Sequence, residues 1–160
     1  MQTRESIGGF SLIEILVVIV IIGITASFAM LSFGDFGKRR KIVLAADNFK
    51  NLVYLVKKEA ILETRTLAIQ IKKDNYRVLC LNNNRWQPLP DIIFKTKKLP
   101  NGAVMFLTVN RQNPAPDLII INPAGDMSPF KLQLGHDKHN ILVTLTGNRG
   151  GTIKQEENAK

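Results

Sequence analysis

The chain has 160 residues, of which 45% are hydrophobic, and a formal net charge of +9. This length suits one domain with an appended segment, and the apolar content is sufficient for a hydrophobic core. The positive charge leaves nucleic acid, anionic lipid and acidic proteins open as partners. The one cysteine, Cys80, excludes an internal disulfide bond, and we expect its side chain to fill space in the core.

An apolar stretch covers residues 10–31 and is interrupted by one carboxylate, that of Glu14. Because a helix needs about 20 apolar residues to cross a bilayer, the sequence predicts a transmembrane helix over 10–31. A cleavable secretory signal is the alternative, with small residues suitable for cleavage at 27–29. Residues 1–9 lack the net positive charge that such a signal carries at its start, which favours the transmembrane interpretation.

A carboxylate within this apolar stretch needs a counter-charge. At the centre of a membrane helix it costs about 2.5–3.5 kcal/mol, whereas near the end of the helix it can reach the headgroups at a lower cost. Cleavage after Gly9 would supply a cation, because the freed amine of Phe10 on a neighbouring parallel helix would lie at the depth of Glu14. An acid that reaches the headgroups and has no further role is the alternative interpretation.

The stretch GGFSLIEILVVIVIIGI (8–24) resembles the class III leader and helix start of type IV pilins and type II secretion pseudopilins. The resemblance implies that residues 1–9 are a leader peptide, which a prepilin peptidase cuts after Gly9. Phe10 would then become the N-methylated terminus of the mature chain. Glu14 would be the acid that pairs with the terminus of a neighbouring subunit during fibre assembly.

Four consecutive cations follow the apolar stretch at 38–41 and predict a basic collar against anionic headgroups. The positive-inside rule would place these cations in the cytoplasm, whereas the pilin resemblance implies the opposite side of the membrane. Just before them, Gly34 and Gly37 weaken the helix and predict a bend.

From Ile42 to Glu63 the apolar residues recur at helical spacing, which predicts an amphipathic helix half over 32–64. The face expected to pack on the following domain consists of Ile42, Ala45, Phe49, Leu52, Val53, Val56 and Ala60. Leu44, Leu55 and Leu62 form a second, narrower stripe on the same helix. The spacing leaves two roles open for this stripe, a wider core contact or a contact with a neighbouring subunit.

After Thr64 the hydrophobic period becomes two, which predicts β-strands. The predicted strands are 67–72, 76–81, 103–109, 117–122, 130–135 and 141–147. Turn-forming residues separate them, so we expect an α+β fold with two small antiparallel sheets at 65–160 packed on the long N-terminal helix, as in type IV pilins. The run LIII (118–121) is apolar without alternation and predicts a central strand that is buried on both faces.

The order of motifs in this half carries a second resemblance. The motifs are EAILETRTLAIQI (59–71), YRVLCLNNNRWQPL (76–89), KLPNGAVM (98–105) and IIINPAGDMSPFKLQLG (119–135). Together they resemble the H-type minor pseudopilins, general secretion pathway protein H of the type II secretion system, within the type IV pilin-like superfamily. The resemblance covers most of residues 9–153.

This resemblance implies a single-pass protein of the bacterial inner membrane whose C-terminal domain lies in the periplasm. Its function would be to help drive the export of folded proteins across the outer membrane as a minor subunit of the pseudopilus. The implied partners are other major and minor pseudopilins, the prepilin peptidase and inner-membrane lipid. No cofactor is implied.

The sequence contains no motif that is typical of an enzyme, such as a nucleophile elbow, a phosphate-binding loop or a zinc-protease helix. His136 and His139 are the residues most similar to metal ligands, but they fall in a predicted loop without enough further ligands for a tetrahedral site. Asp126 is assigned to a turn. We therefore predict no catalytic residue and no metal site.

A minor type IV pilin that binds DNA is the alternative function. The cations that favour it form three groups, Lys95, Lys97 and Lys98, then Arg65, Lys72 and Lys73, and last Arg149 and Lys154. Modules that bind nucleic acid usually combine such cations with exposed aromatic rings. Here Trp86, Phe94 and Phe106 lie among apolar neighbours and are expected in the core, so nucleic acid is the less favoured partner.

Overall fold

The computed structural model describes residues 11–89, 94–100, 102–109 and 117–158, except for the side chains of 29–36. The chain divides into two compact units, Met1–Lys38 and Arg39–Lys160, which we consider separately. One helix, α1 (Leu12–Leu62), contributes to both units. Its backbone is helical throughout, so the predicted weak point at Gly34 and Gly37 does not interrupt the helix.

In the first unit, the part of α1 with described side chains is apolar and exposed. Every side chain from residue 11 to residue 28 is exposed. The hydroxyls of Thr25 and Ser27 donate to carbonyls one turn earlier in the same helix, at 2.9 Å to Ile21 and 2.8 Å to Gly23. These polar groups are thus satisfied inside the helix and need no external partner.

The predicted span 10–31 falls partly outside the described residues, which exclude Phe10 and the side chains of 29–31. Within the described residues, no helix has an apolar stretch long enough to cross a membrane.

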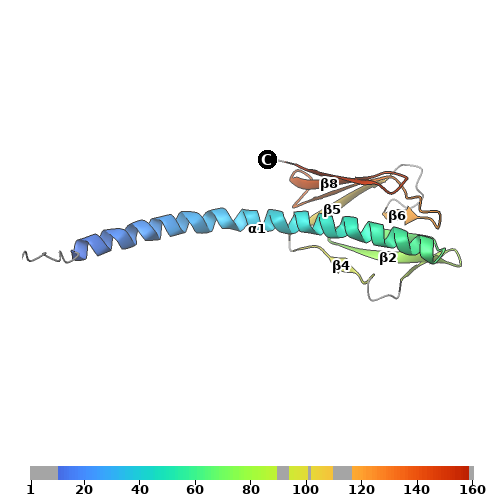
Figure 1. Ribbon diagram of the computed structural model, residues 1–160, viewed down its shortest axis with the longest axis horizontal. Helices are drawn as coiled ribbons and strands as arrows, with labels where there is room; N and C mark the ends of the chain where they lie inside the picture. The colour runs from blue at the N-terminus through green and yellow to red at the C-terminus, as the bar shows by residue number, and fades with distance from the viewer. Residues whose placement is uncertain (1–10, 90–93, 101, 110–116, 159–160) are drawn as a thin grey trace, which may run out of the picture. The chain divides into compact units, whose positions relative to one another are not determined.

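In the second unit, two antiparallel sheets pack against the C-terminal half of α1 (Figure 1). The larger sheet has the order β3-β2-β1-β6, with β4 also paired to β2. Its strands are β1 (Leu67–Ile71), β2 (Asn75–Asn82), β3 (Arg85–Pro88), β4 (Lys97–Lys98) and β6 (Leu118–Ile121). Ile69 of β1 is paired with Val78 of β2 and with Ile119 of β6, which defines the register of the central strands.

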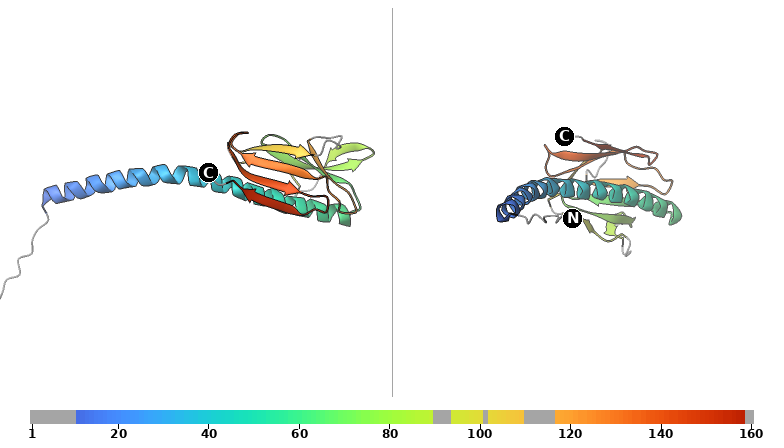
Figure 2. Two further views of the ribbon diagram at one scale, coloured as in Figure 1. Left: turned by 90° about the horizontal axis from the view of Figure 1, so that it is seen from above. Right: turned by 60° about the vertical axis from the view of Figure 1, so that its left-hand side comes forward.

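The smaller sheet has the order β5-β7-β8-β9. Its strands are β5 (Val104–Val109), β7 (Phe130–Gly135), β8 (Ile141–Gly147) and β9 (Ile153–Glu157). In Figure 1 the two sheets diverge behind the second-unit part of α1, and the left view of Figure 2 shows both of them along one flank of this helix. The helix therefore contributes side chains to one core that both sheets share.

The predicted α+β class, the two antiparallel sheets and the six predicted strands are confirmed. The prediction missed β3, β4 and β9, which carry few apolar side chains or consist of only two residues. The prediction that the LIII run forms a central strand is wrong, because β6 lies at the end of its sheet. Its burial is nevertheless as predicted, since Leu118, Ile119 and Ile121 are buried.

A turn after β6 explains how an end strand can be buried so well. The Ser128 N–H donates to the Ile120 carbonyl at 2.8 Å, and the Asn122 N–H donates to the Asp126 carbonyl at 3.0 Å. The turn folds back along β6 and pairs Met127 with Ile121. It takes the position of a neighbouring strand and covers the edge. The bond from the Asn122 N–H to the Asp126 carbonyl confirms the turn role predicted for Asp126.

The core contains the predicted apolar face of α1. Its members Ile42, Ala45, Phe49, Leu52, Val53, Val56 and Ala60 are all buried, and Ala46 joins them. Phe94 is buried as expected, whereas Cys80 and Trp86 are partly buried at the edge of the core. Leu44, Leu55 and Leu62 are 52%, 39% and 66% exposed, so the second stripe does not widen the core contact.

Candidate functional site

Glu14 lies in the first turn of α1 and its side chain is exposed. The Glu14 N–H donates to the Ser11 carbonyl at 2.9 Å, which marks the start of the helix. A carboxylate in this position favourably meets the positive end of the helix dipole. Glu14 can therefore support the helix start and still be available to a cation on another molecule. Gly9 and Phe10, the residues predicted for processing, lie outside the described residues.

The apolar side chains of the first-unit part of α1, on both sides of Glu14 along the helix, are widely exposed. Leu12 is 84% exposed, Ile13 68% and Phe28 70%. Large contiguous apolar patches on a protein surface mark sites of contact with membrane or other proteins. No other described part of the chain covers this surface.

A second exposed apolar surface lies on the second-unit part of α1. It consists of the stripe Leu44, Leu55 and Leu62. These residues are separated by about three and about two helical turns, so they lie along one line of the helix. Tyr54 and Ile61, 42% and 46% exposed, extend it to one side. Of the two roles that the spacing left open for this stripe, the exposure favours contact with a neighbouring subunit.

The basic collar follows on the same helix. The side chains of Lys38, Arg40 and Lys41 are exposed, and Arg39 is half-buried. Arg39 donates from its Nη2 atom to the Asn158 carbonyl at 3.3 Å, which ties the chain end after β9 to the helix. Arg39 thus has a structural role that its place in a run of four cations did not indicate.

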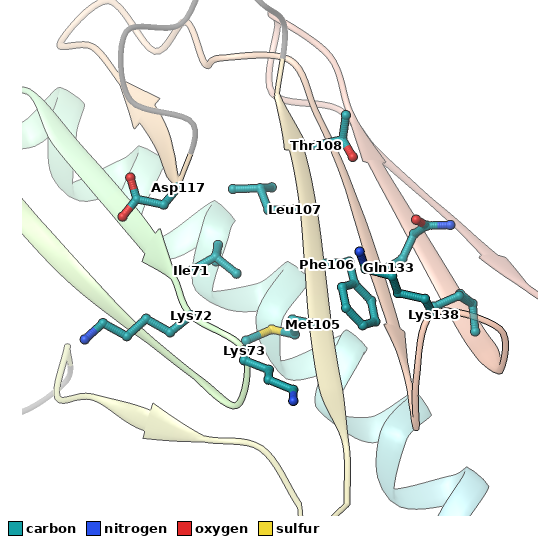
Figure 3. Close-up of a pocket in the computed structure, with 11 residues that line it drawn as sticks. Ile71, Lys72, Lys73, Met105, Phe106, Leu107, Thr108, Asp117, Gln133 and Lys138 are labelled. Carbon is teal, nitrogen blue, oxygen red and sulfur yellow. The ribbon is translucent and has the colours of Figure 1, made fainter.

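A groove of about 600 Å³ opens between the two sheets (Figure 3). Its inner wall is apolar and is formed by Ile71 at the end of β1 and by Met105 and Leu107 on β5. Lys72 and Lys73 extend on the side of the larger sheet, and Lys138 lies on the other side of β5. The size is in the range of small-molecule and peptide sites.

The charges at the groove are predominantly positive. Lys72, Lys73 and Lys138 are exposed, and Lys138 lies over the ring of Phe106 at 5.8 Å from its centroid. Asp117 is the carboxylate on the groove wall, and Gln70 donates to it at 2.7 Å. Among the described residues, none of the three lysines forms an ion pair with a carboxylate.

Along the edge of β5 that borders this groove, some backbone groups have no partner among the described residues. The Met105 N–H donates to the Lys73 carbonyl at 2.8 Å, so the odd residues of β5 direct their backbone groups away from β7. Because backbone direction alternates along a strand, the N–H and C=O groups of Leu107 also face the groove. In the described part of the chain, neither group of Leu107 has a hydrogen-bond partner.

The two histidines lie in the loop between β7 and β8, as predicted. The ring of His136 contacts the Gly102 carbonyl through Nδ1 at 3.0 Å. The N–H groups of His139 and Asn140 donate to Asp137 at 2.7 and 2.8 Å, and these bonds hold the pKa of that carboxyl below its ordinary value. Within the described residues, no group of three or more potential ligands is close enough to hold a metal ion.

The cations that favoured nucleic acid lie on different elements of the β domain and do not form one surface. Lys72 and Lys73 border the groove, Lys97 and Lys98 form β4, and Lys154 lies on β9. Phe94 is buried, so it cannot stack on a base. The prediction for Phe106 is only partly right, because this ring is half exposed and lines the groove.

Sequence reasoning missed the groove as a site. It assigned Lys72 and Lys73 to a cationic cluster and Phe106 to the core, and these residues come together only when β5 lies beside the end of β1. One signal was present in the sequence. The strand VMFLTV carries no charge and no proline, which is unusual for a strand with a free edge.

Comparisons with known proteins agree with the arrangement of helix and sheets. A family model described as type II transport protein GspH matches residues 45–151, and one described as the prokaryotic N-terminal methylation motif matches residues 6–30. The chain is 28% identical over 139 residues to type II secretion system protein H of Pseudomonas aeruginosa, which covers 87% of this chain and 76% of that protein.

Two solved structures share the fold. The minor pseudopilin EpsH from the type II secretion system of Vibrio cholerae gives a TM-score of 0.64 at 18% identity, over 76% of this chain and 97% of that one. The solution structure of GspH from Escherichia coli gives a TM-score of 0.58 at 18% identity, over 75% of this chain and 89% of that one.

Proposed function

The chain belongs to the family of type II transport protein GspH, and from this membership we propose that it is a minor pseudopilin that helps to export folded proteins across the outer membrane. One observation carries the proposal. A match to the N-terminal methylation motif and a match to the GspH domain occur in the same chain and in the order that a pseudopilin requires. An enzyme or a soluble binding module would not need both.

The proposed organisation has four parts. Residues 1–9 form the leader, 10–31 the transmembrane half of the helix, 32–64 its periplasmic half, and 65–160 the periplasmic β domain. The match to the methylation motif supports the first two parts. The exposed apolar side chains of the first unit support the proposal that inner-membrane lipid surrounds this helix before assembly.

We propose that maturation creates the positive charge at the new N-terminus that pairs with Glu14 during assembly. A prepilin peptidase cuts after Gly9, and the new terminus at Phe10 is methylated and remains a cation. Glu14 then pairs with the terminus of an adjacent subunit. The exposed position of Glu14 in the first turn of α1 supports this role, because its carboxylate has no partner among the described residues. In a medium of low dielectric constant, such a pair is strong enough to direct the register of parallel helices.

Other pseudopilins are the proposed assembly partners. Parallel packing would first cover the apolar first-unit part of α1 and then the stripe Leu44, Leu55 and Leu62. This burial would supply the driving force, and the Glu14 pair would supply the register. No residue of the chain is assigned a catalytic role.

Secretion by a strain that lacks this chain tests the proposal. We expect folded exoproteins to accumulate in the periplasm of the deletion strain and to reach the medium again when the wild-type chain is restored. A matched control expresses the chain with residues 1–31 replaced by an ordinary cleaved signal, which should not restore export. Unchanged export in the deletion strain, or rescue by the unanchored domain, would contradict the proposal.

A further inference from the structure

We propose that the groove between the two sheets binds an extended, acidic segment of another polypeptide, which pairs with the free edge of β5 as an added strand. The inference concerns the β domain and does not depend on how the N-terminal helix is processed or assembled. Three observations carry it, namely the free backbone groups of β5, the apolar inner wall and the excess of lysines at the rim.

The free edge of β5 is the first observation. Proteins usually protect a free edge with charged side chains, proline or a bulge, because an unprotected edge pairs with other chains. At the other end of the same sheet, β9 has the sequence IKQEE and is protected in this way. β5 has the sequence VMFLTV and pairs with β7 in regular register from Val104 to Val109. Only one of the two edges is therefore open to a new strand.

The contact between the sheets leaves part of this edge uncovered by the residues that the structure describes. Near its start, β5 is held to the turn after β1 through the bond from the Met105 N–H to the Lys73 carbonyl. Beyond that bond the two sheets separate, and the groove lies along the rest of β5 (Figure 3). The backbone of Leu107 lies in this open part. A segment of about four residues, about 13 Å long, fits beside it at the usual rise of a strand.

The walls determine the composition of the segment. Alternate side chains of an added strand would point toward Ile71 and Leu107 on the inner side, where apolar groups are favoured. The other side chains would point outward, past Phe106 and toward Lys138. With Lys72 and Lys73 across the opening, carboxylates suit these outward positions. Asp117 is a single carboxylate against Lys72, Lys73 and Lys138 among the described lining residues, so the excess of positive charge remains.

Hydrogen exchange on the full chain in non-ionic detergent micelles tests the proposal. The probe is an acetylated and amidated six-residue peptide that alternates valine and glutamate. We expect it to slow exchange of the Leu107 amide by about tenfold or more, because that N–H becomes part of a ladder. A peptide that alternates valine and lysine, and a valine–glutamate peptide with N-methylated valines, should leave the exchange rate of this amide unchanged.

A pair of charge-reversing variants completes the test. The double variant Lys72→Glu/Lys73→Glu should weaken binding of the valine–glutamate probe by about tenfold, whereas Lys154→Glu on β9 should bind it as the wild type does. Unchanged exchange at Leu107 with the probe at saturation would overturn the proposal. Equal binding of the lysine peptide, or of the N-methylated peptide, would also overturn it, because the charge or the strand pairing would then have no role.

Discussion

The ring of Phe49 on α1 meets the ring of Tyr76 on β2 edge to face, with the two centroids 5.2 Å apart and the planes at 88°. On its other side, Phe49 meets Phe130 of β7 at 6.4 Å and 81°. One side chain of the helix thus contacts an aromatic ring in each sheet. Because edge-to-face pairs add to the hydrophobic gain of burial, Phe49 links the three parts of the core.

Replacement of this ring should be costly. We expect Phe49→Ala to lower the free energy of unfolding by about 3–5 kcal/mol, since it leaves a cavity that both sheets and the helix border. Urea unfolding followed by the fluorescence of Trp86 measures the change. Tyr54→Ala is the matched control on the exposed face of the same helix, and it should change the free energy by less than about 0.5 kcal/mol. Equal effects of the two variants would refute the assignment of Phe49 to the centre of the core.

Tyr76 should make the β domain sensitive to alkaline pH. Burial raises the pKa of its phenol above the ordinary value of 10.0, because the charged form loses its hydration. The unfolded chain therefore loses this proton at a lower pH than the folded chain does. The stability that the neutral phenol contributes is fully present below about pH 10 and is lost as the pH rises through the folded-state pKa.

Urea unfolding of the wild type and of Tyr76→Phe at several pH values between about 9 and 11 measures this effect. The free energy of unfolding should fall more steeply with pH in the wild type, because Tyr76→Phe removes the group but keeps the ring. Tyr54→Phe, which changes the exposed tyrosine of the same chain, should retain the wild-type slope. Parallel profiles for the wild type and Tyr76→Phe would contradict the role of Tyr76 in the pH dependence.

The exposed stripe on α1 should matter for assembly and not for folding. We expect the double variant Leu55→Gln/Leu62→Gln to unfold within about 0.5 kcal/mol of the wild type, because glutamine is a good helix former and neither leucine is buried. Co-purification with other pseudopilins from secreting cells should decrease. Asn51→Gln, a polar change on the same face, should co-purify normally. Undiminished co-purification of the leucine variant would remove the stripe from the assembly surface.

Glu14 should act through its charge. Glu14→Val should be incorporated poorly into the fibre while the β domain keeps its free energy of unfolding, because the two lie in different units of the chain. Glu14→Asp keeps the carboxylate and the favourable interaction with the helix dipole, so it should be incorporated better than the valine variant. Cross-linking in intact secreting cells, followed by detection of the chain in complexes with other pseudopilins, compares them. Normal incorporation of Glu14→Val would show that the acid is dispensable.

The second-unit part of the helix could be predicted because a single face of it is buried, and the helical spacing of Ile42, Phe49 and Val56 reports that face. The apolar strands could be predicted from their short runs of apolar residues between turn formers, even where, as in LAIQI of β1, consecutive residues are buried. β4 and β9 could not be predicted in this way, since Lys97 and Glu156 are exposed and the strands form by pairing with neighbours.

Less of the candidate site could be predicted. Glu14 can be found because a carboxylate in an apolar helix conflicts with its surroundings. Gly9 and Phe10 follow from the counter-charge that Glu14 needs together with the resemblance. The groove required the sheets to be known, because Lys73 lies in the turn after β1 and Met105 lies on β5 of the other sheet, and a backbone bond joins them. The spacing of apolar residues within a single strand does not predict where two sheets separate to form a groove.

The intact mass of the chain extracted from secreting cells tests the central claim most directly. The account predicts a polypeptide that begins at methylated Phe10, and it predicts that Gly9→Ala leaves the uncut chain in the membrane. A mature chain that keeps residues 1–9, or one that begins at Met30 after loss of the apolar helix, would contradict the account, because neither could bring a freed amine to Glu14 of an adjacent subunit.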